Sequence, residues 1–216
     1  MKKNLQLKPI ALVLFSAFIF CFGNNAMAIE KAKFNILESD LDFEIRLYVP
    51  QIVAETWVEG DFEEVGKEGF RRLYKYISGN NRKEQSIAMT APVTQEGKSE
   101  KIAMTAPVTQ EIADNKWRIT FMMPSDYSLD ALPEPLDTRV TLKQEPGRLV
   151  AAIKYSGSWS QSRYEEKRAA LKDFIAARGL NAVGEPIWAR YDPPFMPWFL
   201  RRNEVLITVD GMTNGD

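Results

Sequence analysis

Three basic residues of the sequence, Lys67, Arg71 and Lys75, follow one another at intervals of four, and Phe70 and Tyr74 lie between them. In a helix, this spacing places the cations along one stripe and the two rings along the adjoining stripe. Lysine and arginine bind carboxylates, and aromatic rings cover flat apolar groups. The pattern is typical of a site for a flat apolar ligand that carries carboxylates at one edge. A solvated cationic face beside two rings that cover the core would give the same pattern.

Two residue types that carry much of enzyme chemistry are scarce. The sequence has no histidine and one cysteine, Cys21. The missing histidine excludes Ser-His-Asp and Cys-His catalysis, the HExxH zinc site and the facial iron triad in their usual forms. We therefore predict a protein without catalysis. A hydrolase that uses a carboxylate as base, such as Glu63, Glu64 or Glu204, remains an alternative, because a sequence does not show what a base would reach.

The first 28 residues have the pattern of a signal peptide. Three lysines lie within the first eight residues, residues 10–22 are almost wholly apolar, and Ala26-Met27-Ala28 fits a leader-peptidase site. The apolar run is shorter than the ~20 residues that a membrane span needs, although an uncleaved anchor is the alternative. We predict an exported protein, periplasmic or extracellular, with residues 29–216 as one domain and no stable membrane span after cleavage. Cys21 would leave with the leader, so the mature chain would have no disulfide and no covalently attached haem.

The charge of the mature chain argues against one class of partner. Cleavage would remove three lysines and no acidic residue, which moves the net charge from −1 to about −4. Nucleic-acid-binding domains carry a basic excess. We expect no nucleic-acid partner, and the sequence does not indicate a protein partner.

Strands and helices are indicated by alternation, periodicity and breakers. Val65, Gly69, Leu73 and Ile77, with Tyr76, form one face of the first predicted helix, which should pack on a sheet. Glycine ends both predicted helices. The predicted helices are residues 62–78 and 160–178, and the predicted strands are residues 42–58 (two strands or one bent at Pro50), 117–123, 138–144 and 148–155 (as a hairpin), 187–191 and 204–209.

The two halves of the chain echo each other. Val53-Ala54 precedes Gly60 and the first helix, and Val150-Ala151 precedes Gly157 and the second. We therefore predict an α+β fold of two pseudo-symmetric β-rich halves, each with one long helix. The strands would form a β-barrel-like antiparallel sheet or paired sheets, with the helices outside.

Several motifs resemble the SOUL/haem-binding protein family. They are IAMTAPV, MPSDYSLDALPEP and above all YDPPFMPWFLRRNEV at residues 191–205, and the likeness runs from FEIRLY to the last strand. Members of that family have a β-barrel-like sheet of two pseudo-symmetric halves, and their fold is similar to the ligand-binding domain of bacterial multidrug-sensing regulators. The resemblance implies non-covalent binding of haem or a related tetrapyrrole in an apolar groove beside the first helix, as a carrier or buffer. Other planar amphipathic ligands, or an interaction module without a ligand, are the alternatives.

The residues that the resemblance assigns to the groove are Lys67, Phe70, Tyr74 and Lys75, with Arg71 in the same stripe. Some family members carry a histidine between arginine and tyrosine in the strand that opens the domain, proposed as the iron ligand. Leu47 stands at that place here. Haem would then take tyrosine, methionine or no ligand from the protein. Tyr74 is the first candidate, followed by Met89, Met104 and Met196.

The decapeptide IAMTAPVTQE occurs twice, at residues 87–96 and 102–111. Two copies are too few for a solenoid. Pro92 and Pro107 each remove a hydrogen-bond donor, so neither copy can be an uninterrupted strand. We interpret the duplication as an insertion into a scaffold that needs one copy, and we expect the duplicated segment to form a projecting hairpin or a long loop.

Overall fold

The computed structural model describes residues 29–83, 99–113, 115–193 and 195–211. The predicted leader, residues 1–28, and the first decapeptide, residues 87–96, lie outside these ranges. Within the described ranges, neither helix has the length and apolar character needed to cross a bilayer.

Nine strands form one antiparallel sheet, in the order β10-β4-β8-β7-β12-β13-β11-β3-β2. Two further pairs are short, β1 with β6 and β5 with β9. The elements are β1 (Glu30–Lys31), β2 (Phe34–Asp40), β3 (Phe43–Tyr48), β4 (Gln51–Val58), α1 (Phe62–Ile77), β5 (Asn81–Arg82), β6 (Thr105–Ala106), β7 (Val108–Ala113), β8 (Lys116–Met122), η1 (Leu129–Ala131), β9 (Glu134–Pro135), β10 (Val140–Glu145), β11 (Arg148–Tyr155), α2 (Gln161–Ala177), β12 (Asn181–Arg190), η2 (Trp198–Leu200) and β13 (Asn203–Asp210).

The predicted two halves are confirmed by the strand order. Apart from the edge strand β2, the order β10-β4-β8-β7 mirrors β3-β11-β13-β12, and the halves meet where β7 pairs with β12. β4 leads into α1 and β11 leads into α2. The turns after these strands contain Gly60 and Gly157, with φ of 135° and 129°, a backbone region that side chains larger than glycine rarely enter.

The predicted hairpin of residues 138–155 is wrong. β10 pairs with β4, whereas β11 pairs with β3 and β13. The pairings Glu145↔Gln51 and Arg148↔Tyr48 place the two proline-containing links, residues 49–50 and 146–147, opposite each other. The chain bends at both links. One link joins β3 of the second half to β4 of the first, and the other joins β10 of the first half to β11 of the second.

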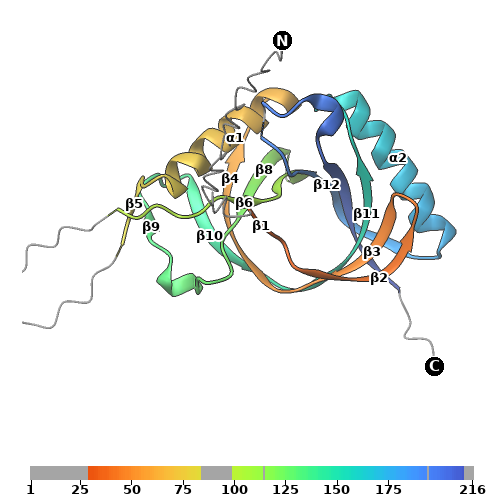
Figure 1. Ribbon diagram of the computed structural model, residues 1–216, viewed down its shortest axis with the longest axis horizontal. Helices are drawn as coiled ribbons and strands as arrows, with labels where there is room; N and C mark the ends of the chain where they lie inside the picture. The colour runs from red at the N-terminus through yellow and green to blue at the C-terminus, as the bar shows by residue number, and fades with distance from the viewer. Residues whose placement is uncertain (1–28, 84–98, 114, 194, 212–216) are drawn as a thin grey trace, which may run out of the picture.

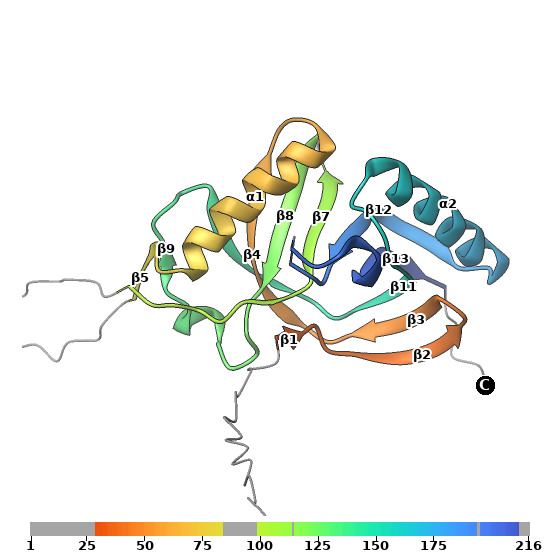
Figure 2. The same ribbon diagram turned by 45° about the horizontal axis from the view of Figure 1, so that its top comes forward.

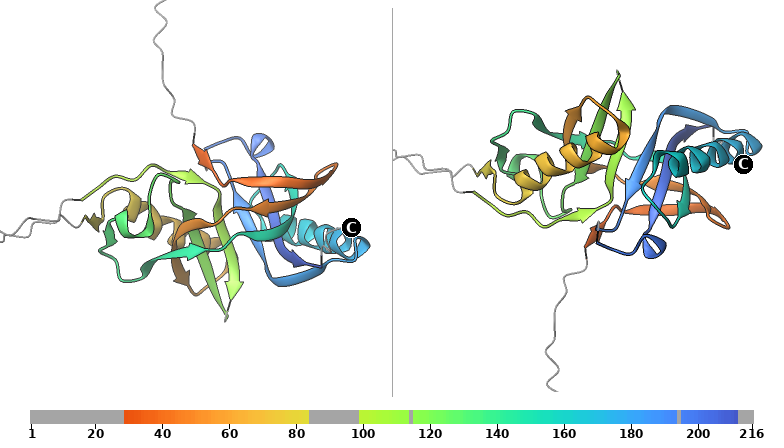
Figure 3. Two further views of the ribbon diagram at one scale, coloured as in Figure 1. Left: turned by 90° about the horizontal axis from the view of Figure 1, so that it is seen from below. Right: turned by 90° about the horizontal axis from the view of Figure 1, so that it is seen from above.

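The sheet is strongly curved but open, so it is barrel-like without being a closed barrel. Its edges are β10 and β2. Both helices lie on its outer face, α1 over the first half and α2 over the second (Figure 1). Figure 2 shows η2 between the halves, and both views of Figure 3 place η2 on the same side of the molecule as β1.

The first helix has the predicted packing face. Its buried residues include Val65, Leu73, Tyr76 and Ile77, which the 3.6-residue period places together. At Gly69, an added Cβ would lie 2.5 Å from Ile119 Cγ1 of β8. Glycine is therefore needed for α1 to approach the sheet this closely.

The predicted projecting hairpin or loop is wrong for the second decapeptide, residues 102–111, which is built into the fold. Ile102 is buried in the core beneath α1, β6 pairs with β1, and β7 occupies the centre of the sheet. Pro107 separates β6 from β7, as its missing donor requires. Asn81 joins the described residues before 84 to those after 98. Its Nδ2 donates a hydrogen bond to the backbone oxygen of Glu100, and its Oδ1 accepts one from the backbone N–H of Glu100, both of 2.8 Å.

Deleting residues 97–111 should leave the fold intact. The product places residues 87–96 directly before Ile112, with the same ten residues that now form β6 and most of β7. Gln85 would then stand two residues before the motif, where Glu100 stands now. We expect the free energy of unfolding to change by less than about 2 kcal/mol, because loop closure depends weakly on length and few contacts are lost.

Chemical denaturation followed by circular dichroism measures this change. Deletion of both copies, residues 87–111, is the control and should abolish cooperative unfolding. A non-cooperative transition in the shorter deletion would show that residues 87–96 cannot replace 102–111.

Candidate functional site

A cavity of about 580 Å³ lies at the seam between the two halves. It is bounded by the first half of α1, by β6, β7 and β12, and by the segment that follows β12. Its volume falls within the ~300–1,000 Å³ of small-molecule pockets. The walls are mainly apolar and aromatic, and they include Phe70, Met104, Val108, Trp159, Trp188, Tyr191 and Phe195.

The helix contributes one stripe to this cavity. Glu63, Gly66, Lys67 and Phe70 are spaced i, i+3, i+4 and i+7, and all four line it. Phe70 is half-buried and packs edge-on against Phe121, with ring centroids 5.3 Å apart. Lys67 and Phe70, predicted from the sequence, are therefore placed at the cavity.

The other three predicted residues lie outside the cavity lining. Tyr74 is 49% exposed and stacks on Phe70, with centroids 5.8 Å apart. Arg71 is exposed and pairs with Glu68, and Lys75 is exposed near the end of α1. The cavity reaches only the first half of the helix, so the stripe of cations continues past it.

Arg190 of β12 is a cation in the cavity that the sequence analysis missed. Its Nη2 donates a hydrogen bond of 2.6 Å to Gln110 Oε1. Its guanidinium carbon lies 3.9 Å from the ring centroid of Trp188 and 5.3 Å from that of Trp159. Desolvation lowers the pKa of Arg190 to about 10, although Tyr155 and Glu63 act in the opposite direction.

Gly66 makes room for this arrangement. A Cβ at Gly66 would lie 2.6 Å from Arg190 Nη2 and 2.8 Å from Gln110 Oε1. Gln110 is fixed in turn, because its Nε2 donates to the backbone oxygen of Phe62 at 2.9 Å. The amide thereby holds the guanidinium between α1 and the sheet.

One sequence signal could have found Arg190. Trp188 and Arg190 are two residues apart in a strand, so both side chains point to the same face. A charged residue in phase with a buried tryptophan is unusual for a strand interior. Trp159 gave no comparable signal, since it lies before α2 and reaches the cavity only through the tertiary fold.

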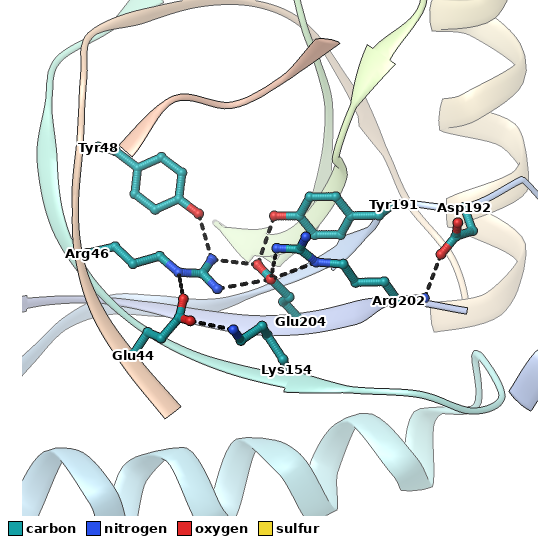
Figure 4. Close-up of polar contacts among 8 residues, drawn as sticks. All are labelled: Glu44, Arg46, Tyr48, Lys154, Tyr191, Asp192, Arg202 and Glu204. Atoms are coloured by element: carbon teal, nitrogen blue, oxygen red, sulfur yellow. Dashed lines mark hydrogen bonds and ion pairs between the residues drawn. The ribbon is translucent and has the colours of Figure 1, made fainter. Parts of the chain in front are cut away.

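The inner face of the sheet, opposite α2, carries a buried charge network (Figure 4). Arg46 and Glu204 are 0% exposed and form two hydrogen bonds, of 2.7 and 3.0 Å. Arg46 Nε also donates to Glu44 at 2.7 Å, and Lys154 pairs with the same carboxylate. Arg202 completes the network by pairing with Glu204 at 2.6 Å.

The cations of this network keep the carboxylates ionised. Burial by itself would raise the pKa of Glu204, but the hydrogen bonds and charges of Arg46 and Arg202 outweigh it and lower the pKa below its usual value. Burial would also raise the pKa of Glu44. The hydrogen bonds and charges of Lys154 and Arg46 outweigh burial, so the pKa of Glu44 is lowered.

The network adjoins the cavity through Tyr191 and Asp192. The hydroxyl of Tyr191 donates to Glu204 at 2.8 Å, and Asp192 accepts the backbone N–H of Arg202. Both residues also line the cavity. The far wall of the cavity is therefore fixed by the buried ion pairs.

The three carboxylates considered as bases lie in different surroundings. Glu204 is fully buried and bound by two arginines and a tyrosine, so it holds the fold together. Glu64 pairs with Lys67 at 2.6 Å on the exposed side of α1. Glu63 lines the cavity.

The candidate iron ligands also differ in whether they line the cavity. Met104 lines the cavity, whereas Tyr74 and Met196 are outside its lining. Met89 lies outside the described residues. Tyr191 lines the cavity, but its hydroxyl is committed to Glu204. Among the described lining residues, Met104 is therefore the one thioether available to an iron.

The family comparison matches almost all of the described chain. A family model described as "SOUL heme-binding protein" matches residues 29–99 and 94–208. Each of the two matches contains one copy of the decapeptide. The two matched ranges overlap at residues 94–99.

Curated relatives and solved structures agree with this match. "Heme-binding protein 1" of Xenopus laevis is 28% identical over 76% of this chain and 81% of that protein, and "Heme-binding protein 2" of Homo sapiens is 27% identical over 75% and 79%. The fold is similar to the C-terminal domain of EcmrR, with a TM-score of 0.55, 11% identity, and coverage of 78% of this chain and 96% of that one. A hydrolase from Listeria innocua has a TM-score of 0.51, 12% identity, and coverage of 81% and 94%.

Proposed function

This chain belongs to the SOUL heme-binding protein family, and from that membership we propose that it binds haem or a related tetrapyrrole non-covalently in the cavity between α1, β7 and β12. The protein would act as a carrier or buffer, with the bound ring unchanged. The observation that carries the proposal is the cavity itself, whose walls are aromatic and whose charged side chains are few. Such a site suits a flat apolar ring.

The lining residues fit the two parts of a tetrapyrrole. Phe70, Trp159, Trp188 and Val108 supply apolar and aromatic surface for the ring. Lys67 and Arg190 supply positive charge for propionate groups. Tyr74, stacked on Phe70 outside the cavity, would extend the wall toward any part of the ring that projects from it.

Iron binding by the protein is a minor part of this proposal. Bound haem would bring iron with its usual capacity for axial ligands. Met104 is the lining residue able to provide one, whereas Tyr74 is not among the lining residues. Recognition would then rest on the ring and its carboxylates, and iron-free protoporphyrin should bind about as well as haemin.

Titration of residues 29–216 with haemin, followed in the Soret region, tests the proposal. We expect saturable binding at one site per chain. Lys67→Glu should weaken it about three- to tenfold, because the new carboxylate would repel a propionate at the cavity. Lys75→Glu is the matched control: it makes the same charge change two turns along α1, outside the cavity, and should leave the affinity unchanged.

Two results would count against the proposal. Absence of saturable binding would exclude the tetrapyrrole function. Equal loss of affinity in both variants would show that the ligand responds to the overall charge of α1 and lies outside the cavity. A low-spin bis-imidazole spectrum would point to a tag or buffer ligand, because the chain has no histidine.

A further inference from the structure

Three arginines of the sheet, on β3, β8 and β12, have desolvated guanidinium groups. They differ in whether a carboxylate lies beside the charge. Arg46 bonds Glu204 and Glu44. Arg118 contacts Glu55, Glu111 and Glu145 at 2.6, 2.7 and 2.6 Å. Arg190 has no carboxylate within 4.0 Å among the described residues; its hydrogen-bond partner is the neutral amide of Gln110.

This difference is visible in the pKa directions. Desolvation lowers the pKa of all three guanidinium groups, but the carboxylates reverse the shift for Arg46 and Arg118, whose pKa values are raised. At Arg190 desolvation prevails and the pKa stays lowered. A desolvated charge without a counter-charge is costly to folding, and proteins retain such groups mainly at sites that bind something.

The guanidinium also has the geometry for an anion. It carries five N–H donors in a planar fork, and its one described hydrogen bond uses the Nη2 group. Trp188 and Trp159 flank it and exclude water from its faces. Gln110 and Gly66 fix its position, so little side-chain entropy remains to be lost on binding a carboxylate.

Two acidic residues share the cavity, and neither matches this charge. Glu63 lies on the first turn of α1 and acts on Arg190 only at longer range. Asp192 already accepts the backbone N–H of Arg202. The positive site at Arg190 therefore stays open to a ligand group.

We propose that Arg190 binds a carboxylate of the ligand at the β12 wall of the cavity, so that the site selects flat apolar molecules with a free carboxylate over their neutral analogues. This inference rests on the proposed function and specifies its ligand class. The ligand would enter with its carboxylate toward Arg190 and its ring against Trp159, Trp188 and Phe70. Lys67 would meet a second carboxylate at α1, where the ligand has one.

Protoporphyrin IX and its dimethyl ester provide the test, because they share the ring and differ in charge. Quenching of tryptophan fluorescence measures both affinities, since two tryptophans line the cavity. We expect the wild-type protein to bind the free acid about 10–100-fold more tightly than the ester, as for other desolvated charged contacts. In Arg190→Gln the two affinities should become equal within about threefold, through loss of acid binding, while ester binding is kept.

The control is Arg163→Gln, which removes a solvent-exposed arginine of α2 and should keep the preference. Arg190→Gln should fold at least as stably as the wild type, because it removes an unmatched charge; a thermal midpoint verifies this. Arg190→Lys, which keeps the charge but loses the fork, should retain part of the preference.

The outcomes separate this inference from the proposed function. Equal binding of acid and ester by the wild type, or an acid preference that survives in Arg190→Gln, would overturn the inference and leave the proposed function standing. If neither porphyrin binds the wild type, the proposed function fails and the inference fails with it.

Discussion

Replacing Arg46 with methionine should reduce the free energy of unfolding by about 3–5 kcal/mol, because the change removes the cation that bonds both buried carboxylates, Glu204 and Glu44. Glu204 is 0% exposed and Glu44 is 4% exposed, so water cannot replace the guanidinium. Methionine keeps the apolar length of the side chain, and the loss is therefore that of the charge and its hydrogen bonds. Urea denaturation at pH 7 measures the change.

The pH dependence of this variant should have the opposite sign from that of the wild type. In the wild type the pKa values of Glu204 and Glu44 are lowered. Their contribution to stability is therefore complete above the unfolded pKa of about 4.3 and is lost as pH falls through the folded pKa. Without Arg46, burial should raise the pKa of Glu204 above the unfolded value. The folded variant would then bind the extra proton, and its stability should fall as pH rises from about 4.

A matched exposed pair supplies the control. Arg163 is 43% exposed and pairs with Glu166 in α2. Arg163→Met should change the stability little, as is usual for exposed ion pairs. If Arg46→Met is equally mild, or if it keeps the acid-side loss of the wild type, the network contributes far less to folding than its burial indicates.

Replacing Val108 with tryptophan should abolish tetrapyrrole binding, with a loss of at least about 100-fold, or about 2.8 kcal/mol. Val108 begins β7 and lines the cavity, half-buried. The indole would occupy space that the ring needs. Because it would extend into the cavity rather than into packed core, the thermal midpoint should stay within a few degrees of the wild type.

Ile112→Trp is the control for this blocking variant. Ile112 lies on the same strand, four residues further on, is 37% exposed and is not among the cavity-lining residues. It adds the same side chain to β7 and should leave the affinity for haemin unchanged. Undiminished haemin binding by Val108→Trp, measured at the Soret band, would place the ligand elsewhere on the molecule.

Local pattern was enough to determine the helices and the face that α1 buries. Val65, Leu73 and Ile77 are brought together by the helical period alone, whatever they pack against. Gly79 and Gly179, each with positive φ, follow the two helices as predicted. The stripe formed by Lys67 and Phe70 was found in the same way, since residues three and four apart are neighbours on any helix.

The two halves were also predicted from the sequence, because the segment that leads into the second helix resembles the segment that leads into the first. The pairing of the strands could not be predicted in this way. β10 and β11 have the spacing of a hairpin, yet β10 pairs with β4 and β11 pairs with β3, both of which come far earlier in the chain. Strand pairing depends on which chains meet at the two proline-containing bends, and no local preference specifies that.

Only the tertiary structure decided what the charged residues do. Glu204 in sequence is a carboxylate that could serve as a base; in the fold it meets Arg46, 158 residues away, and becomes part of a buried ion pair. Arg190 differs from other arginines only in what surrounds it: two tryptophans, one amide and no carboxylate at ion-pair distance among the described residues. The charge of a residue is a property of its type, whereas its solvation and its partners are set by distant parts of the chain.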